Sequence, residues 1–332
     1  MLSAAVPGIL RRALGPRWEF TLRGDYLTIE HPQRGTPYRP PSRRLTWDEL
    51  LNRLEGAFAG IGVPRADCLP LRWGRETELT VSAVQALDPC LKDRRAVPYR
   101  QGFLPQPVVR LTGHRDRHGN LLDGFLTSFV NASRVQPVPD ARSYGTILDE
   151  WLTVLSLLGL HARHITVYGT LKVWRRRQVE GVTLRYDHAG LPLGDIVLLR
   201  NADDPSRMAV DLGTSLERLA WVRSRLPWHQ QVFGPLAGAA PPAVLDAIRT
   251  VTLLVGHGIT PTARGAGSVT RRIADRIPPS AAALGLSTAV RHHHAYWDSM
   301  SPLPVPWWHV ASALEVHIQR PPRGGGHRRP LE

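Results

Sequence analysis

Alternating apolar and polar positions divide much of the chain into short strands. The predicted strands are rich in β-branched and aromatic residues and end at turn-forming residues. They comprise ETELTVSAVQAL (76–87), QPVVRLTG (106–113), GFLTSFVNAS (124–133), HARHITVYGTLKVW (161–174), GVTLRYDHAG (181–190), GDIVLLRN (194–201) and RMAVDLG (207–213). The second and third flank the polar segment 114–123, which predicts an antiparallel hairpin with a long basic tip. Residues 18–32 alternate in the same way and predict another hairpin.

Apolar residues recur at helical spacing in several other segments. The first predicted helix, 47–62, is capped by Thr46 and ends at Gly60 or Gly62. Its buried side comprises Leu50, Leu51, Leu54 and Phe58. The other predicted helices are 144–160, 214–226, 241–258 and 267–277.

Helices placed among mostly antiparallel strands predict an α+β fold. We expect an N-terminal arm over 1–45, made of the hairpin and a Pro/Arg-rich linker, then a core over 46–235 and a helical domain over 236–320. The tail, 321–332, is of low complexity and is expected to be disordered. The chain has neither a P-loop motif nor G-x-G-x-x-G, so its sequence does not indicate a P-loop or Rossmann nucleotide site.

Composition and charge narrow the classes of function. The 332 residues are 42% hydrophobic, without an apolar run near the roughly 18 residues of a membrane span. We therefore expect a cytoplasmic protein that does not enter a membrane. The net charge of +14, nearly all of it from arginine, favours anionic partners such as tRNA or nucleotides.

Few residues suggest a metal centre. Cys68 and Cys90 are too few for a zinc site or a disulfide framework. His292, His293 and His294 have no second cluster to complete a metal site, so we expect them to be solvated or at a helix end.

The segment VDLGTSLERLAWVRSRL, 210–226, raises a specific question of charge. Thr214 or Ser215 can cap its helix. Arg218 then falls in the first turn, at the positive end of the helix dipole, where a cation costs a few tenths of a kcal/mol. This position indicates an anionic partner.

Five segments, taken in order, resemble the catalytic core of alanyl-tRNA synthetase, a class II aminoacyl-tRNA synthetase. VDLGTSLERLAWV is similar to motif 3 of the family, D-x-G-x-G-L-E-R. QPVVR followed by GFLTSFVNAS is similar to the motif 2 hairpin, and residues 248–277 to a helical stretch that ends in R-G-Y-V-L-R-R-I. HITVY and TLRYDHAG match two intervening family strands. The resemblance covers about Leu45 to Ile277.

The resemblance implies a class II antiparallel sheet that binds ATP with Mg²⁺. It makes Arg110 and Arg218 the catalytic cations on the phosphates and adds Phe125, Ser128 and Glu217 to the ATP site. Fixed cations suit this reaction because negative charge develops as a carboxylate attacks the α-phosphate and pyrophosphate leaves. By residue type alone, an arginine in a helix is more often solvated or paired with a nearby acid.

The resemblance also implies an amino-acid site. Asp211 corresponds to the aspartate that holds the substrate ammonium, and Gly213 lets the backbone approach the substrate. Trp174 is the equivalent of a tryptophan beside the small side chain, and Asp195 replaces a substrate-contacting asparagine. The alternatives are a turn residue for Asp211 and a core or interface residue for Trp174. Asp195 is either a second anchor for the amine or a mark of altered specificity.

The chain departs from the family where the family reads tRNA. We expect no editing domain and no oligomerising tail, because the remaining residues are too few for them. The acceptor-facing loops are rewritten as TGHRDRHGN and PTARGAG, and their arginines Arg115, Arg117 and Arg264 are the predicted acceptor contacts.

Three hypotheses follow. The first is ATP-dependent activation of a small amino acid, L-alanine foremost, as the aminoacyl adenylate, with transfer to a non-decoded acceptor such as a small metabolite or nucleoside natural product. The second is a truncated alanyl-tRNA synthetase that charges tRNA(Ala) or a minihelix at the acceptor end. The third is an inactive paralogue that binds tRNA or a protein. Each is compatible with a homodimer.

Overall fold

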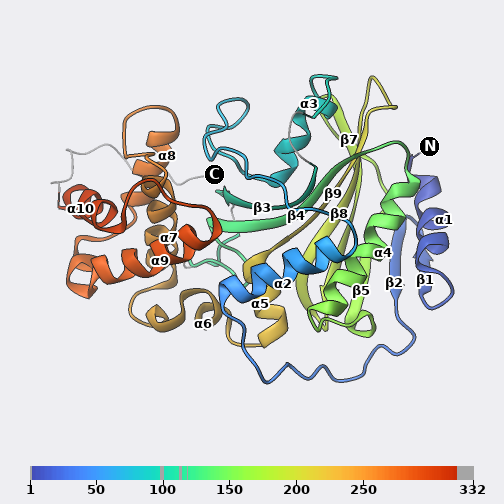
Figure 1. The fold of residues 1–332 in the computed structure, drawn as a ribbon, viewed down its shortest axis with the longest axis horizontal. Helices are drawn as coiled ribbons and strands as arrows, with labels where there is room; N and C mark the ends of the chain where they lie inside the picture. The colour runs from blue at the N-terminus through green and yellow to red at the C-terminus, as the bar shows by residue number, and fades with distance from the viewer. Residues whose placement is uncertain (1, 98–100, 112–113, 118, 320–332) are drawn as a thin grey trace. The chain divides into compact units, whose positions relative to one another are not determined.

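The computed structural model describes residues 2–97, 101–111, 114–117 and 119–319 (Figure 1). The chain divides into two compact units. Unit 1 comprises Met1–Leu69, Ser82–Gln106 and Val130–Leu226, and unit 2 comprises Pro70–Val81, Pro107–Phe129 and Pro227–Glu332. This division differs from the predicted one: the arm 1–45 belongs to unit 1, and part of the predicted core groups with the helical unit. The predicted disordered tail, 321–332, lies outside the described residues.

The described residues form an α+β fold with a nine-stranded sheet, which confirms the predicted fold class. The strand order is β1-β2-β5-β7-β8-β9-β4-β3, and β6 pairs with β7. The strands are β1 (Glu19–Arg23), β2 (Tyr26–Glu30), β3 (Gly102–Val109), β4 (Ser128–Val138), β5 (Ile165–Thr170), β6 (Trp174–Arg176), β7 (Val179–His188), β8 (Leu191–Asn201) and β9 (Met208–Ser215). Pairing is antiparallel throughout the series from β1 to β4. The predicted N-terminal hairpin is confirmed as β1 and β2.

One strand prediction is wrong. Residues 76–87 contain no strand, and Ala83–Leu87 instead forms a 3₁₀ helix followed by α3 (Asp88–Leu91). The Ser82 hydroxyl accepts the Val84 N–H at 3.4 Å, and the Gln85 side chain accepts the Ser82 N–H at 3.1 Å. This S-x-x-Q capping box begins a helical turn where the alternation of residue types predicted a strand.

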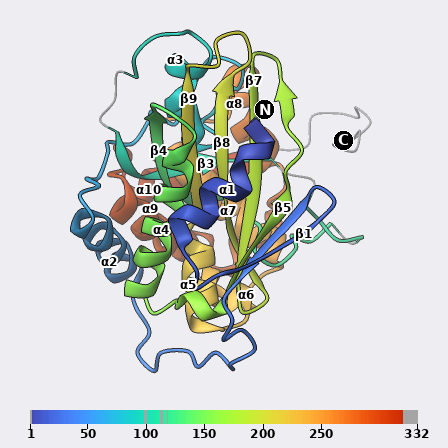
Figure 2. The same cartoon turned by 90° about the vertical axis from the view of Figure 1, so that its right-hand side faces the viewer.

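Two helices cover the apolar face of the sheet in unit 1: α1 (Leu2–Leu14) and α4 (Arg142–Leu157) (Figure 2). At most 1% of Leu184, Ile196 and Leu212 on this face is exposed. At Gly145 of α4, a Cβ atom would lie only 2.8 Å from the Ala13 Cβ of α1, so the close approach of the helices requires glycine there. The segment predicted as an arm thus begins with a packed helix.

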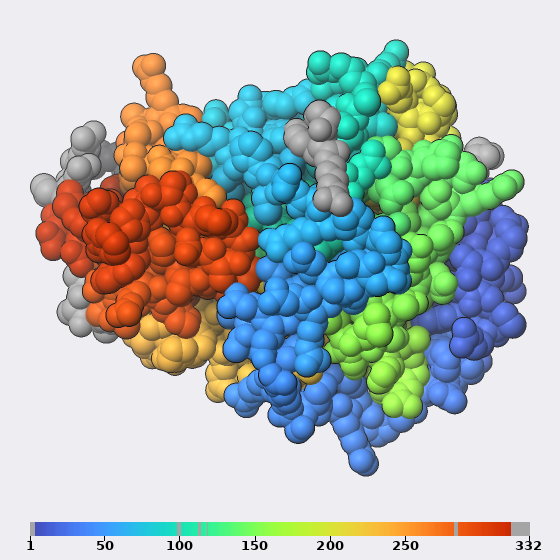
Figure 3. All heavy atoms as spheres, in the orientation of Figure 1, coloured from blue at the N-terminus to red at the C-terminus, as the bar shows by residue number. Residues whose placement is uncertain are grey.

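Helix α2 (Trp47–Gly60) begins and ends as predicted. The Thr46 hydroxyl accepts the Glu49 N–H at 3.2 Å, and the Glu49 carboxylate accepts the Thr46 N–H at 3.0 Å. The four residues predicted on its inner face are all buried. The linker before α2, residues 31–45, runs along the surface of unit 1 and is blue in Figure 3.

Unit 2 contains helices packed around a buried cation. They are α6 (Trp228–Phe233), α7 (Pro242–Gly256), α8 (Gly265–Ala274), α9 (Leu286–Met300) and α10 (Trp307–Ile318). Only 1% of Arg249 in α7 is exposed, and its guanidinium lies 4.1 Å from the ring centroid of Tyr296 and 4.4 Å from that of Trp297. These aromatic faces supply favourable electrostatic contacts for a charge removed from water.

The position predicted for the histidine triplet is wrong. His292, His293 and His294 lie within α9, well inside its ends, and His293 is fully buried. Because α9 packs against α7, this side of the helix faces the interior of unit 2. Burial, together with the charge of Arg249, holds the pKa of His293 well below its usual value.

Within the described ranges, the helices are all too short or too polar to span a bilayer.

A cluster of aromatic and basic side chains ties the linker to the sheet in unit 1. The Tyr38 ring meets His188 edge-on at 4.6 Å and His164 at 5.4 Å. Arg225, which follows α5 (Leu216–Ser224), donates to the His188 carbonyl at 2.8 Å, and its Nη2 lies 3.2 Å from His188 Nδ1. Burial and the charge of Arg225 lower the pKa of His188 to about 3, so the ring is neutral in the folded protein.

We expect acid to destabilise unit 1 through His188. The unfolded chain binds a proton on His188 near pH 6.5, whereas the folded chain binds it only near pH 3. The free energy of unfolding is therefore unaffected by this group above about pH 6.5 and decreases as the pH falls from 6.5 toward 3. The slope approaches about 1.4 kcal/mol per pH unit for this one group. Urea unfolding at pH 7 and pH 5 should show a smaller loss for His188→Phe than for the wild type.

Equal losses in wild type and His188→Phe would contradict the assignment.

Candidate functional site

The sheet face opposite α1 and α4 carries a row of polar residues in unit 1. Arg185 of β7 pairs with Asp195 of β8, Asp195 pairs with Gly213 of β9, and Gly213 pairs with Ser133 of β4. Residues directly opposite one another in an antiparallel sheet share a face. The row therefore brings together two of the predicted amino-acid contacts, Asp195 and Gly213, from different strands.

Asp211 lies on the same face, two residues before Gly213 on β9. Its neighbours in register are Val197 of β8 and Val135 of β4, both buried, so the half-buried carboxylate has apolar side chains on either side. Such a setting limits hydration of the carboxylate and favours a positively charged partner.

The pKa of Tyr186 is affected by the carboxylates of this region. Its hydroxyl donates to the Gly213 carbonyl at 2.8 Å. Burial above all, with the negative charges of Asp195 and Asp211, holds the pKa of Tyr186 well above its usual value. Both predicted carboxylates thus act electrostatically on one buried side chain beneath the row.

Glycine at 213 is closely surrounded by polar groups. A Cβ atom there would lie 3.2 Å from Ser133 Oγ, 3.4 Å from Asn131 Nδ2 and 3.8 Å from Asp195 Oδ1. A larger side chain would have to displace those neighbours. Glycine therefore lets Asp195, Ser133 and Asn131 lie close together around the backbone of residue 213.

Asn131 holds one side of this space rigid. Its amide nitrogen donates to Ser133 Oγ at 2.8 Å and to the Thr214 carbonyl at 3.1 Å. Its amide oxygen accepts the Ala83 N–H at 3.0 Å and the Ser82 hydroxyl at 3.2 Å. Asn131 and Ser133 were not predicted as site residues, although their two-residue spacing on a predicted strand places them on one face.

Trp174 of β6 lies on the same face of the sheet. Its indole N–H donates to Thr183 Oγ1 at 2.9 Å, and its ring packs over Gly181, where a Cβ would meet the ring at 2.9 Å. Thr183 lies two residues before Arg185 on β7, so both side chains are on the polar face. The half-buried ring is thus an aromatic wall on the face that carries Asp195 and Asp211.

Arg218 lies in the first turn of α5, as predicted. Ser215 caps this helix, and its hydroxyl accepts the Arg218 N–H at 3.0 Å. The guanidinium lies close enough to Asp187 of β7 to influence it: burial raises the pKa of Asp187, while the Tyr168 hydroxyl and the charges of Arg185 and Arg218 oppose that rise. The polar face therefore carries both signs of charge.

Two side chains predicted to bind ATP are enclosed instead. Glu217 is fully buried in unit 1, and its two carboxylate oxygens accept the Val130 N–H at 3.2 and 3.3 Å. Ser128 is fully buried in unit 2, where its hydroxyl pairs with that of Thr250 at 2.8 Å. These contacts connect elements within each unit, so we leave both residues out of the proposed ligand site.

The other predicted nucleotide and acceptor contacts belong to unit 2. The Arg110 Nε donates to the Val81 carbonyl at 2.9 Å, and its guanidinium lies 5.2 Å from the centroid of the Phe129 ring. Phe125 stacks on His114 with centroids 4.0 Å apart. The predicted acceptor residues lie in loops: Arg115 donates to the Gly119 carbonyl at 2.8 Å, and Arg117 and Arg264 are exposed.

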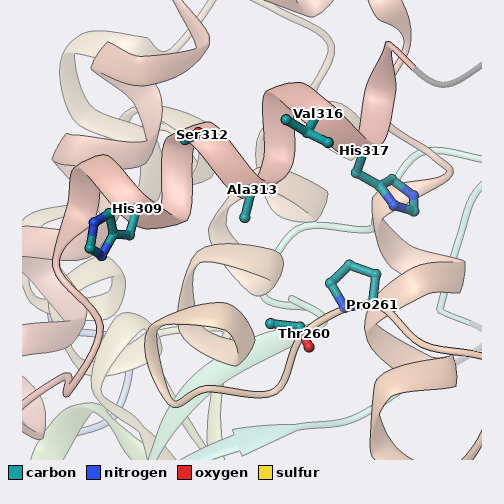
Figure 4. Close-up of a pocket in the computed structure, with 7 residues that line it drawn as sticks. All are labelled: Thr260, Pro261, His309, Ser312, Ala313, Val316 and His317. Carbon is teal, nitrogen blue, oxygen red and sulfur yellow. The ribbon is translucent and has the colours of Figure 1, made fainter.

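A groove of about 380 Å³ lies along α10 in unit 2 (Figure 4). Its lining residues are Thr260, Pro261, His309, Ser312, Ala313, Val316 and His317. The residues predicted from the sequence as site residues do not contribute to this lining. Cys68 and Cys90 are free thiols, and the described residues include no group of three or more His, Cys, Asp or Glu side chains placed to hold a metal.

Comparison of the chain with models of known protein families and with curated proteins gives no match.

The burial of Glu217 predicts a structural rather than a ligand-binding effect on mutation. Glu217→Ala leaves the Val130 N–H without its acceptor and should lower the free energy of unfolding by about 2–3 kcal/mol. Glu217→Gln keeps an acceptor oxygen and should cost less. Urea unfolding of both variants at pH 7 measures the difference, and an alanine variant as stable as wild type would refute the structural role.

Proposed function

We propose that the polar face of unit 1 binds a small amino acid and activates it with ATP as an aminoacyl adenylate. One observation carries the proposal: Asp195 and Asp211 share a sheet face with the backbone of Gly213, which has no side chain between its polar neighbours. Together with the ordered motifs in the sequence, this arrangement supports an active site similar to that of class II synthetases.

The ammonium of the amino acid is the expected partner of the carboxylates. A charge-assisted bond between ammonium and carboxylate contributes roughly 1.5–3 kcal/mol. Asp211, flanked by Val135 and Val197, is the principal anchor, and Asp195 adds a second negative charge for the same group. Trp174 would border the side chain of the amino acid and favour a small one.

Arg218 is the proposed phosphate ligand within unit 1. Its position in the first turn of α5 combines its own charge with the partial positive charge of the helix N-terminus, and both favour an anion. Arg110 of unit 2 is proposed as the second cation on the basis of the resemblance alone. Mg²⁺ would enter as the ATP complex, bound mainly through phosphate oxygens.

The proposed reaction has two balanced steps. A carboxylate oxygen of the amino acid forms a bond to the α-phosphorus as the bond to the bridging oxygen breaks, and pyrophosphate leaves with its electron pair. A hydroxyl or amine of the acceptor then attacks the aminoacyl carbonyl, loses its proton and expels AMP. Arg218 would stabilise the negative charge that develops in the first step, and Mg²⁺ bound with ATP would supply further positive charge there.

We propose a non-decoded small molecule as the acceptor. The principal anchor, Asp211, is similar to the family aspartate, whereas the loops that carry Arg115, Arg117 and Arg264 differ from the family's acceptor-reading segments. The net charge of +14 favours the second candidate, a tRNA acceptor, because many arginines can contact phosphates. The third candidate, an inactive paralogue, does not need to retain the charged groups of the polar face.

ATP–pyrophosphate exchange with a panel of amino acids tests the proposal. We expect exchange with alanine, and Asp211→Asn should lower kcat/KM for the amino acid about tenfold to a hundredfold, because it removes the anchor's charge and keeps its shape. Arg218→Ala should lower the rate by roughly 10²–10³. The exposed residues Asp48 and Arg53 of α2 provide matched controls, Asp48→Asn and Arg53→Ala, which should leave exchange unchanged.

Absence of exchange with every amino acid would refute activation and favour an inactive, tRNA- or protein-binding role. Normal exchange in Asp211→Asn would refute the assignment of the ammonium site.

The dependence of transfer on salt distinguishes the two acceptors. For a small acceptor, Arg115→Ala or Arg264→Ala should impair transfer sharply, and the rate should respond weakly to salt. For tRNA, each variant should have a modest effect, and the logarithm of affinity should fall with the logarithm of salt by about 0.9 for each duplex phosphate contacted. Measuring transfer to candidate nucleosides and to bulk tRNA between low and moderate salt separates the cases, and we expect the first pattern.

A further inference from the structure

The first strand of the sheet has a free side. Among the residues that the structure describes, β1 is the terminal strand in the order of the sheet and pairs only with β2 (Figure 2). Four of its five residues are exposed, and Leu22 is 55% exposed. The sheet therefore offers this edge for pairing with another strand.

The pairing of β2 with its two neighbours identifies which backbone groups point outward from β1. The Leu171 N–H donates to the Asp25 carbonyl at 2.7 Å, so the odd-numbered residues of β2 and its preceding turn bond toward β5. Backbone direction alternates along a strand, so the even-numbered residues of β2 bond toward β1. Their partners in β1 are Glu19, Thr21 and Arg23. The N–H and C=O groups of Phe20 and Leu22 therefore face the free edge.

The sequence of β1, EFTLR, is complementary to itself in antiparallel orientation. When two copies pair with Thr21 opposite Thr21, each Glu19 lies opposite an Arg23. The same register sets Phe20 opposite Leu22 twice, and these are the residues whose backbone groups face outward. Charge, side-chain type and backbone hydrogen bonding thus agree on a single register.

We propose that β1 pairs with β1 of a second copy of this chain, in a two-fold symmetric dimer centred on Thr21. The two sheets become continuous. Glu19 and Arg23 form ion pairs across the axis on the polar face, and Phe20 and Leu22 meet on the face that α1 covers. Within one chain, the Glu19 carboxylate also forms an ion pair with Arg34.

The dimer should be weak and dependent on concentration. Two five-residue strands bury less than the roughly 1,200 Å² typical of the smallest stable complexes. We expect a dissociation constant on the order of 10–100 μM, the range of transient association. The proposal is independent of the amino-acid activation proposed above.

Sedimentation equilibrium of the full chain between about 5 and 500 μM tests the proposal. The wild type should show a monomer–dimer equilibrium. Arg23→Glu and Glu19→Arg each place like charges opposite one another twice and should weaken the dimer about tenfold or more. The double variant Glu19→Arg/Arg23→Glu restores opposite charges and should restore dimerisation. Because the double variant also loses the Glu19–Arg34 pair, its recovery isolates the contact between copies.

Two further variants control for folding and net charge. Arg53→Glu makes the same charge change at an exposed site in α2 and should leave the dimer intact. Leu22→Pro removes an N–H that faces the free edge and should abolish the dimer without lowering the melting temperature of the monomer by more than a few degrees. A wild type that stays monomeric over the whole range would overturn the proposal, as would a dimer of equal strength in both single charge variants and the double variant.

Discussion

The antiparallel register between β8 and β9 is the constraint on which the proposed site depends. It places Asp195 opposite Gly213 and Val197 opposite Asp211. Because side chains alternate between faces, a slip of β9 by one residue against β8 would turn Asp211 toward α1 and α4, away from the face that carries Asp195, and would expose Leu212. Burial of Ile196, Leu198 and Leu212 on the apolar face therefore fixes the position of the carboxylates on the other.

Local signals in the sequence predicted many of the elements. Thr46 and Glu49 form the capping box of α2, and the two-residue turn at Gly24 and Asp25 closes the first hairpin. These features depend on a few neighbouring residues, so the sequence alone reveals them. Pairing between distant strands is different, since nothing in the sequence of β8 specifies that Asp195 lies beside Gly213 rather than another residue. The motif resemblance grouped Asp195, Asp211, Gly213 and Trp174, and the register gives that grouping a physical basis within unit 1.

The predictions that the structure contradicts share a cause. Residues 76–87 alternate like a strand, but the capping box at Ser82 starts a helical turn. His293 is polar and was expected near solvent, yet α9 turns it toward α7, where the buried Arg249 also lies. Glu217 is adjacent to a proposed phosphate ligand in the sequence, but helical geometry directs it to the Val130 N–H instead. In each case tertiary packing or capping outweighs residue type, and periodicity does not reveal which partner a side chain will meet.

The polar face carries arginines and aspartates close to one another. Arg218 stands at the unfavourable end of its own helix dipole, and Asp187 lies where burial raises the pKa of its carboxyl group. Neither Arg218 nor Asp187 therefore lies where its own surroundings favour its charge. The two charges stabilise each other because the sheet holds them on one surface, where the charges of Arg185 and Arg218 lower the pKa of Asp187. A zwitterionic ligand suits such a surface, since its ammonium can satisfy a carboxylate while its negative end approaches a guanidinium. The proposed amino-acid ligand carries both signs of charge and would complement this surface, whereas a singly charged metabolite would complement only one of its two signs.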